Sequence, residues 1–195
     1  MLRDWECDTV REPQWFAVHT RAKHERRVQR ELESRIQLTT FLPLLTETHQ
    51  WSDRRKLIEV PLFSSYLFIR AIYSPELRQS VLRSQSILGF VGIGGQGLPI
   101  PSVEIESVRQ LISAMMPLCH YPFVKQGQRV RIRGGALDNV EGIVVMNEGR
   151  KLIVSVDMIS RSVAIQLEGC AYELEPVEEK RLPARAAAFA AAGLT

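Results

Sequence analysis

The pattern of hydrophobic and polar positions changes character near residue 117. Before it, short apolar runs alternate with stretches of helical periodicity, which predicts the element order β-α-β-β-α-β-α. After it, residues 124–177 are short β-rich runs separated by turns of Gly and Asn, which predict a small five-stranded barrel. The pattern therefore predicts an α+β protein with two domains.

The first predicted helix begins near Arg21 and has two different sides. At about 100° per residue, Val28, Leu32 and Ile36 fall on one side. The opposite side carries the basic residues Lys23, Arg26, Arg27 and Arg30. The apolar side predicts packing against a sheet, whereas the basic side is equally consistent with a solvated face and with contacts to phosphate groups.

The strand predicted at residues 66–69, with the sequence YLFI, has no polar face. Because successive side chains point to opposite faces, Leu67 and Ile69 serve one face and Tyr66 and Phe68 serve the other. The second face is either another core layer or a partner surface. The predicted element order has few helices to cover both faces of a sheet, so it favours the partner surface.

A β-hairpin is predicted from the strands at residues 40–44 and 57–60. Its polar tip carries Arg54, Arg55 and Lys56 beside Trp51. A basic turn with an aromatic side chain can follow a nucleic-acid backbone, although solvated basic turns are commoner.

The segment GIGGQG at residues 92–97 matches the spacing of a dinucleotide-binding loop. Such a loop requires a helix that opens directly after it, with its N-terminus on the pyrophosphate. The following Leu98-Pro99-Ile100-Pro101 forbids that helix, so we expect a flexible loop without a cofactor.

The composition is that of an ordinary globular protein with a modest basic excess. Of its 195 residues, 45% are hydrophobic and 24% are charged, and the net charge is +3. Residues 14–117 carry 13 Lys and Arg against 9 Asp and Glu, whereas residues 124–177 carry 7 of each kind. The three cysteines and four histidines have neither disulfide nor zinc spacing, and their order indicates no catalytic set. We therefore expect no metal, no cofactor and no enzymatic activity.

The domain boundaries follow from prolines and from the ends of the periodic pattern. We expect a flexible arm at residues 1–13, a first domain at 14–116, a linker at 117–123, a second domain at 124–177 and a flexible tail at 178–195. The start of the chain lacks the apolar stretch of a signal peptide, and no run approaches the roughly 18 residues of a membrane span. A cytoplasmic monomer without a membrane partner is therefore expected.

Several segments together resemble the NusG family of transcription elongation factors. The segments WFAVHTRAKHERRVQREL, PLFSSYLFIR and SILGFVGIGG are similar to its N-terminal domain, called NGN. The segments GQRVRIRGGALDNVEGIVV and RKLIVSVDMISRSVAIQL are similar to the KOW barrel that ends these proteins. The resemblance covers about residues 14–177, and the spacing in WSDRRKLIEVPLF is most similar to the specialised RfaH and UpxY branch.

The resemblance implies a ferredoxin-like α/β sandwich followed by a small SH3-like five-stranded β-barrel. It implies that the open sheet face of the NGN domain binds the clamp helices of the largest RNA polymerase subunit, at positions matched by Phe63, Tyr66 and Phe68. In the RfaH branch the basic helix lies near upstream or non-template DNA. The candidate nucleic-acid contacts are thus Arg21, Lys23, Arg27 and Arg30, together with Arg26 and the tip residues Arg54, Arg55 and Lys56.

The sequence departs from the family pattern in two turns. Phe63-Ser64-Ser65-Tyr66 replaces the Phe-Pro-Gly-Tyr or Phe-Pro-Asn-Tyr of many relatives, so this turn is less rigid. Ile159-Ser160-Arg161 stands where NusG proteins present an aromatic-Gly-Arg turn to Rho or a ribosomal protein. These three residues are the candidate KOW partner site, and the lost aromatic residue argues against Rho. The β-branched runs at 143–145 and 153–156 favour strands, so we expect an ordinary barrel without fold switching.

The expected function is that of a non-enzymatic, specialised NusG-type factor. Such a factor binds RNA polymerase through its NGN domain and suppresses pausing and termination on selected operons. One alternative is a general NusG that assists pausing or Rho-dependent termination. Another is an RNA-binding or ribosome-assembly protein, because KOW barrels also occur in ribosomal proteins.

Overall fold

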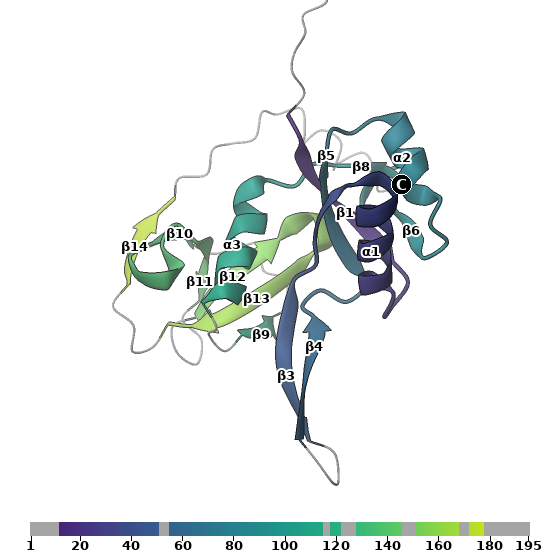
Figure 1. The fold of residues 1–195 in the computed structure, drawn as a ribbon. Helices are drawn as coiled ribbons and strands as arrows, with labels where there is room; N and C mark the ends of the chain where they lie inside the picture. Colours follow the sequence, from purple (N-terminus) through teal and green to yellow (C-terminus); the bar gives the residue numbers. More distant parts are fainter. Residues whose placement is uncertain are drawn as a thin grey trace, which may run out of the picture.

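The computed structural model describes residues 12–50, 55–114, 118–121, 128–145, 151–167 and 172–177. Most of the expected arm, the expected tail and Arg54 of the hairpin tip lie outside these ranges. Within them, an α/β part is followed by an antiparallel β-sheet, which confirms the predicted α+β class (Figure 1).

The N-terminal part is built on a four-stranded antiparallel sheet in the order β2-β5-β1-β6. Its strands are β1 (Gln14–Thr20), β2 (Thr39–Phe41), β5 (Tyr66–Ala71) and β6 (Ile87–Phe90). Helix α1 (Glu25–Ile36) follows β1, and helix α2 (Pro75–Leu82) follows β5. This β-α-β-β-α-β arrangement is the ferredoxin-like order that the family resemblance implied.

Helices α1 and α2 cover one face of this sheet. The buried cluster on that face contains Phe16, Val18, Val28, Leu32, Leu67, Ile69 and Val81. It confirms the predicted apolar side of α1 and one predicted face of the aromatic strand. Helix α1 begins only at Glu25, because Lys23 has a positive φ of 65° that interrupts helical geometry. Arg21 and Lys23 therefore lie in the turn before the helix.

Helix α3 (Ser102–Ser113) covers much of the opposite face, which the sequence analysis expected to stay partly open. One buried cluster joins side chains of this face and of the helix, among them Trp15, Ala17, Phe68, Ile105 and Val108. The Ile100 N–H donates to the carbonyl oxygen of Trp15 (2.8 Å), which fixes the chain to the sheet just before α3 begins. The centre of the aromatic face is therefore a second core layer.

Strands β3 (Leu44–Gln50) and β4 (Arg55–Pro61) form a two-stranded ribbon that projects from the rest of the molecule (Figure 1). The predicted hairpin arm at residues 40–44 was wrong in its position, because Thr40 belongs to β2 of the main sheet. Pro43 lacks an N–H group and separates β2 from β3. Arg55 and Lys56, expected at the tip, instead lie within β4.

The expected flexible loop at residues 92–97 is a second, very short hairpin. Strands β7 (Gly92–Ile93) and β8 (Gln96–Gly97) pair across a two-residue turn. Gly94 and Gly95 have φ values of 59° and 72°, the left-handed conformation that both central residues of a type I′ turn require. The two adjacent glycines thus make a tight turn where the sequence analysis expected a loop.

The turn before the aromatic strand contains one strained residue, Ser65, whose φ is 68°. The strain persists because the Ser65 N–H donates to Glu25 Oε1 (2.7 Å) and the Ser65 carbonyl accepts from the Thr20 N–H (2.9 Å). Ser65→Gly is expected to raise the free energy of unfolding by about 0.5–1 kcal/mol, because glycine adopts positive φ without a Cβ clash. Urea denaturation measures this change. Ser64→Gly is the control, because Ser64 is not among the positive-φ residues and no gain in stability is expected there. An equal gain in both variants would contradict the interpretation that Ser65 is strained.

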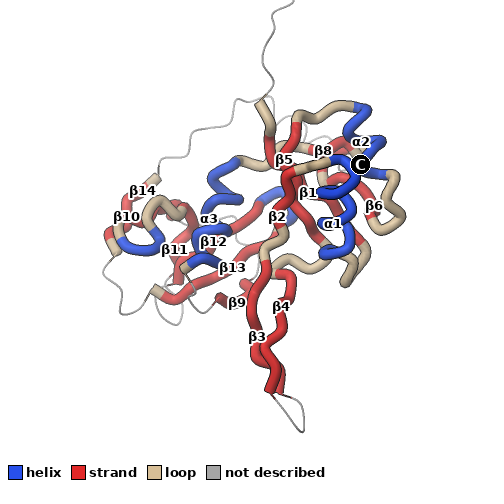
Figure 2. The backbone as a smooth tube through the Cα atoms, viewed as in Figure 1, coloured by secondary structure: helices blue, strands red, loops and turns tan. Residues whose placement is uncertain are grey.

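The C-terminal part is a six-stranded antiparallel sheet in the order β14-β10-β11-β12-β13-β9 (Figure 2). Its strands are β9 (Leu118–Tyr121), β10 (Gln128–Arg133), β11 (Glu141–Val145), β12 (Lys151–Val156), β13 (Arg161–Gln166) and β14 (Glu173–Pro176). Two short 3₁₀ turns, η1 (Gly135–Leu137) and η2 (Asp157–Ile159), connect strands of this sheet. The β-branched runs form β11 and β12, as predicted.

The sheet differs from the expected five-stranded barrel in two respects. Strand β9 lies inside the expected linker and pairs with β13, because Pro117 and Pro122 only flank the segment and leave its own N–H groups free to pair. Among the pairings between described residues, none joins β14 to β9 and closes the sheet.

Candidate functional site

One end of the α3-side sheet face remains accessible. Tyr66 of β5, His19 of β1 and Gly89 of β6 lie in one row across three strands, because His19 pairs in register with both neighbours. The rings of His19 and Tyr66 stack with their centroids 5.3 Å apart. His19 is exposed, Tyr66 is half-buried, and a Cβ added at Gly89 would meet nothing within 4 Å. We call these three residues the docking strip.

The other two predicted docking residues are buried in this structure. Phe63 is 2% exposed and Phe68 is 0% exposed, and their rings meet edge to face with centroids 6.2 Å apart. Phe68 also stacks with Phe41 at 6.2 Å. Both phenylalanines belong to a buried cluster that also contains residues of α3 and of the C-terminal sheet, so only Tyr66 of the three is available for contact in this conformation.

Sequence reasoning missed His19 as a functional candidate. The histidines were considered only for metal spacing and for catalytic sets, and His19 fits neither. The alternation along β1 was the available signal, since it puts His19 on the same face as Trp15 and Ala17.

An arginine closes the far edge of the aromatic cluster. The Arg109 guanidinium of α3 lies 5.7 Å from the Trp15 ring centroid and 4.9 Å from that of Phe41. Glu106 accepts a hydrogen bond from Arg109 Nη1 (3.0 Å) and holds it over the rings. A cation over an aromatic face is favourable, so Arg109 covers the edge of the cluster at Trp15 and Phe41.

The predicted basic side of α1 is mostly free to contact an anionic partner. Arg21, Lys23, Arg27 and Arg30 are exposed. Arg26 is engaged, since its Nη2 atom lies 2.6 Å from Glu59 Oε2 of β4.

Sequence reasoning missed one exposed cation at the end of helix α2, next to a segment that contacts α1. Arg83 is exposed at the end of α2. The segment after it packs alongside α1, because Ser84 Oγ donates to Glu31 Oε2 (2.7 Å) and the Ser86 carbonyl accepts from the Arg21 N–H (2.9 Å). This packing places the end of α2, where Arg83 lies, beside α1.

The candidate KOW partner turn is only partly exposed. Ile159 is 5% exposed and belongs to the core, whereas Ser160 and Arg161 are exposed. Ser160 has a φ of 49°, a conformation that favours glycine. This conformation agrees with the glycine that the family pattern has at the middle position.

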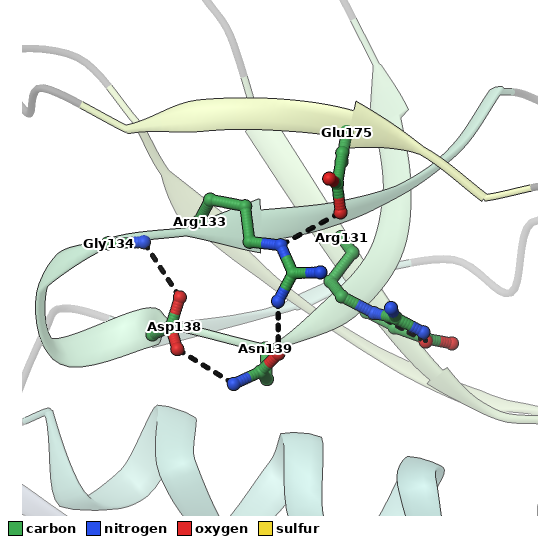
Figure 3. A network of polar contacts seen from close by, with 7 residues as sticks. Arg131, Arg133, Gly134, Asp138, Asn139 and Glu175 are labelled. Carbon is green, nitrogen blue, oxygen red and sulfur yellow. Dashed lines mark hydrogen bonds and ion pairs between the residues drawn. The ribbon is translucent and has the colours of Figure 1, made fainter.

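A polar network stabilises the turn between β10 and β11 (Figure 3). Arg133 donates to Glu175 Oε2 (2.8 Å) and to Asn139 Oδ1 (2.6 Å), which links β14 to the turn. Asp138 Oδ1 accepts from the Gly134 N–H (2.8 Å) and closes the turn on itself. Asn139 Nδ2 also donates to Asp138 Oδ2 (2.7 Å), so the four side chains form one chain of hydrogen bonds that holds the turn and β14 together.

The described ranges contain neither a metal-binding cluster nor a membrane-spanning helix. No group of three or more His, Cys, Asp or Glu residues in them could hold a metal ion. No helix in the same part of the chain is long and apolar enough to cross a membrane.

Comparison with known proteins agrees with this architecture. Residues 13–109 match the family described as transcription termination factor nusG. The transcription termination/antitermination protein NusG of Lactococcus lactis is 29% identical over 164 residues, covering 79% of this chain and 89% of that protein. Its counterpart in Borreliella burgdorferi is 23% identical over 173 residues, covering 79% and 94%. A solved structure concerning domain interaction in Thermotoga maritima NusG is similar in fold, with a TM-score of 0.50 at 21% identity, and covers 86% of this chain and 98% of that one.

The sequence match and the fold lead to the same assignment. The match spans the α/β part, and the relatives extend through most of both chains. The fold of the solved structure likewise covers both parts. The family consists of transcription factors and is not enzymatic, which confirms that expectation. In sequence and in fold, this chain is therefore similar to the NusG transcription termination/antitermination proteins.

Proposed function

We propose that the docking strip binds RNA polymerase, through the clamp helices of its largest subunit, and that the bound protein suppresses pausing and termination on selected operons. The observation that carries this proposal is the stacked pair of Tyr66 and His19, which α3 leaves accessible. A large, rigid aromatic side chain on a sheet offers contact area at low entropic cost, as interface hot spots do.

Phe63 and Phe68 support the strip from within the core. The Tyr66 N–H donates to the Phe63 carbonyl (3.2 Å), and Tyr66 packs against the cluster that contains both phenylalanines. We propose that they fix the position of Tyr66, so that their contribution to polymerase binding is indirect unless α3 moves.

Nucleic-acid contacts are a second part of the proposal. The exposed Arg21, Lys23, Arg27 and Arg30 would meet upstream or non-template DNA through its phosphates. Arg26 would join them only by leaving Glu59, which is feasible because exposed ion pairs contribute at most about 1 kcal/mol. We also propose phosphate contacts for the projecting β3–β4 ribbon, where Arg55 and Lys56 lie in β4. Phosphate contacts of this kind give salt-dependent binding without sequence recognition.

A general NusG role is the second candidate function. The exposed Ser160 and Arg161 and the glycine-like conformation of Ser160 favour it, since they retain part of the turn that NusG proteins present to Rho or a ribosomal protein. The buried Ile159 provides no aromatic contact there.

Tyr66→Ala is expected to weaken binding to core RNA polymerase about 30-fold, the size of a hot spot of about 2 kcal/mol. Titration of labelled protein with core polymerase measures the affinity, and circular dichroism checks the fold. Ile93→Ala is the matched control, because Ile93 is an apolar side chain, 62% exposed, on the β7–β8 hairpin. Wild-type affinity in folded Tyr66→Ala would remove the strip from the interface.

Transcription in vitro separates the two candidate functions. On a template with a pause site and a terminator, a specialised factor increases read-through without Rho. A general NusG, the second candidate function, instead increases termination when Rho is present.

A further inference from the structure

Helix α3 is buried on two neighbouring sides. Ile105 is buried on the side that also carries Arg109, whose guanidinium lies over Trp15 and Phe41 of the N-terminal sheet. Glu104, Ser107 and Leu111 are also buried, and a spacing of about 100° per residue places them on the adjacent side. Because α3 contacts β11, β12 and η1, this second side faces the C-terminal sheet (Figure 1).

Two polar side chains on that second side bond to the backbone of the C-terminal sheet. Glu104 Oε2 accepts from the Asp157 N–H (3.1 Å), and Ser107 Oγ accepts from the Glu141 N–H (3.1 Å). Glu104 is 8% exposed and Ser107 is 2% exposed. Burying polar groups costs free energy unless they find hydrogen-bond partners, and here the C-terminal sheet supplies them.

The charged groups around Glu104 come from several elements. Asp157 of η2 has the same charge, and Arg129 of β10 has the opposite charge. Glu141 of β11 is paired with Arg131 (2.5 Å), and Glu106 of α3 with Arg109 (3.0 Å). Burial raises the pKa of the Glu104 carboxyl to about 7, the Asp157 charge adds to the rise, and the Asp157 N–H and Arg129 oppose it.

We propose that Glu104 is a proton-operated latch between α3 and the C-terminal sheet. Its protonated carboxyl lets the two pack together, and its ionisation favours their release. The latch joins two parts of one chain, so it holds or fails independently of the proposed polymerase contact.

The direction of the pH effect follows from the two states of Glu104. When α3 and the sheet separate, water reaches the carboxyl and its pKa returns towards the ordinary value of 4.5, whereas it is about 7 in the packed state. The packed state therefore binds the proton more tightly. Between these two values packing weakens as the pH rises, and above about 7 it weakens no further.

Hydrogen exchange of the full chain tests the latch even when release is rare. The Asp157 and Glu141 amides report directly, because their N–H groups bond to α3. Their protection factors, corrected for the intrinsic pH dependence of exchange, are expected to fall roughly 30-fold between pH 5.5 and 8. In Glu104→Gln, whose amide oxygen can still accept the Asp157 N–H, they are expected to stay constant over the same range.

Glu106→Gln is the matched control, because Glu106 is an exposed carboxylate on the same helix. It should reproduce the wild-type pH profile. The latch is wrong if wild-type protection is independent of pH, or if Glu104→Gln shows the wild-type profile. Either result is decisive once circular dichroism shows that the variants are folded.

Discussion

Phe68→Ala is expected to lower the free energy of unfolding by about 3–5 kcal/mol, the typical cost of truncating a buried phenylalanine to alanine. Phe68 is 0% exposed, and its ring lies 6.2 Å from those of both Phe41 and Phe63. It also belongs to the cluster that joins the N-terminal sheet to α3, so the lost side chain leaves a cavity between two layers. Urea denaturation followed by tryptophan fluorescence measures the loss.

The control for this prediction is Ile93→Ala, which removes an apolar side chain that is 62% exposed and should change stability by no more than about 0.5 kcal/mol. A loss in Phe68→Ala as small as that of the control would mean that α3 does not cover the face in solution. The expected large loss also has a consequence for binding studies. Weaker polymerase binding by Phe68→Ala could not be interpreted as a lost contact, whereas Tyr66→Ala allows that interpretation.

Local sequence patterns correctly predicted the conformation and the buried side of those elements in which both depend on the element's own residues. The spacing of Val28 and Leu32 was enough to place one side of α1 in the core. The β-branched runs in β11 and β12 were enough to predict strands. In each case periodicity and side-chain shape act within one element, so the sequence of that element is sufficient.

The features that sequence analysis missed depend on contacts between distant elements. Nothing in residues 66–69 indicates that α3 will cover Phe68, because that depends on where the chain goes after Ile100. Glu104 resembles an ordinary acid in the first turn of a helix, and only the C-terminal sheet makes it a buried group. The docking strip is likewise what remains after α3 has packed. The alternation along β1 places His19 on that face, but it does not indicate that His19 stays accessible.

Gly142→Ala is expected to lower the free energy of unfolding of the C-terminal sheet by about 1–3 kcal/mol, as overpacking of a tight interior does. A Cβ at Gly142 would lie 2.5 Å from the Ile153 carbonyl oxygen and 3.1 Å from Leu152 Cδ1. The first of these atoms is backbone of the neighbouring strand β12, so the two strands would have to separate. Urea denaturation and hydrogen exchange of β11 and β12 amides measure the effect.

Gly89→Ala provides the matched control, because the same methyl group in β6 would meet nothing within 4 Å and should cost no more than about 0.5 kcal/mol. Equal effects of the two substitutions would contradict the close approach of β11 and β12. The expected difference also bears on the contact with α3. Since Glu141 is next to Gly142 and donates its N–H to Ser107, a displaced β11 should lower the protection of the Glu141 amide at every pH. The Glu104 latch predicts a loss that depends on pH, so the two causes of release can be told apart by the same measurement.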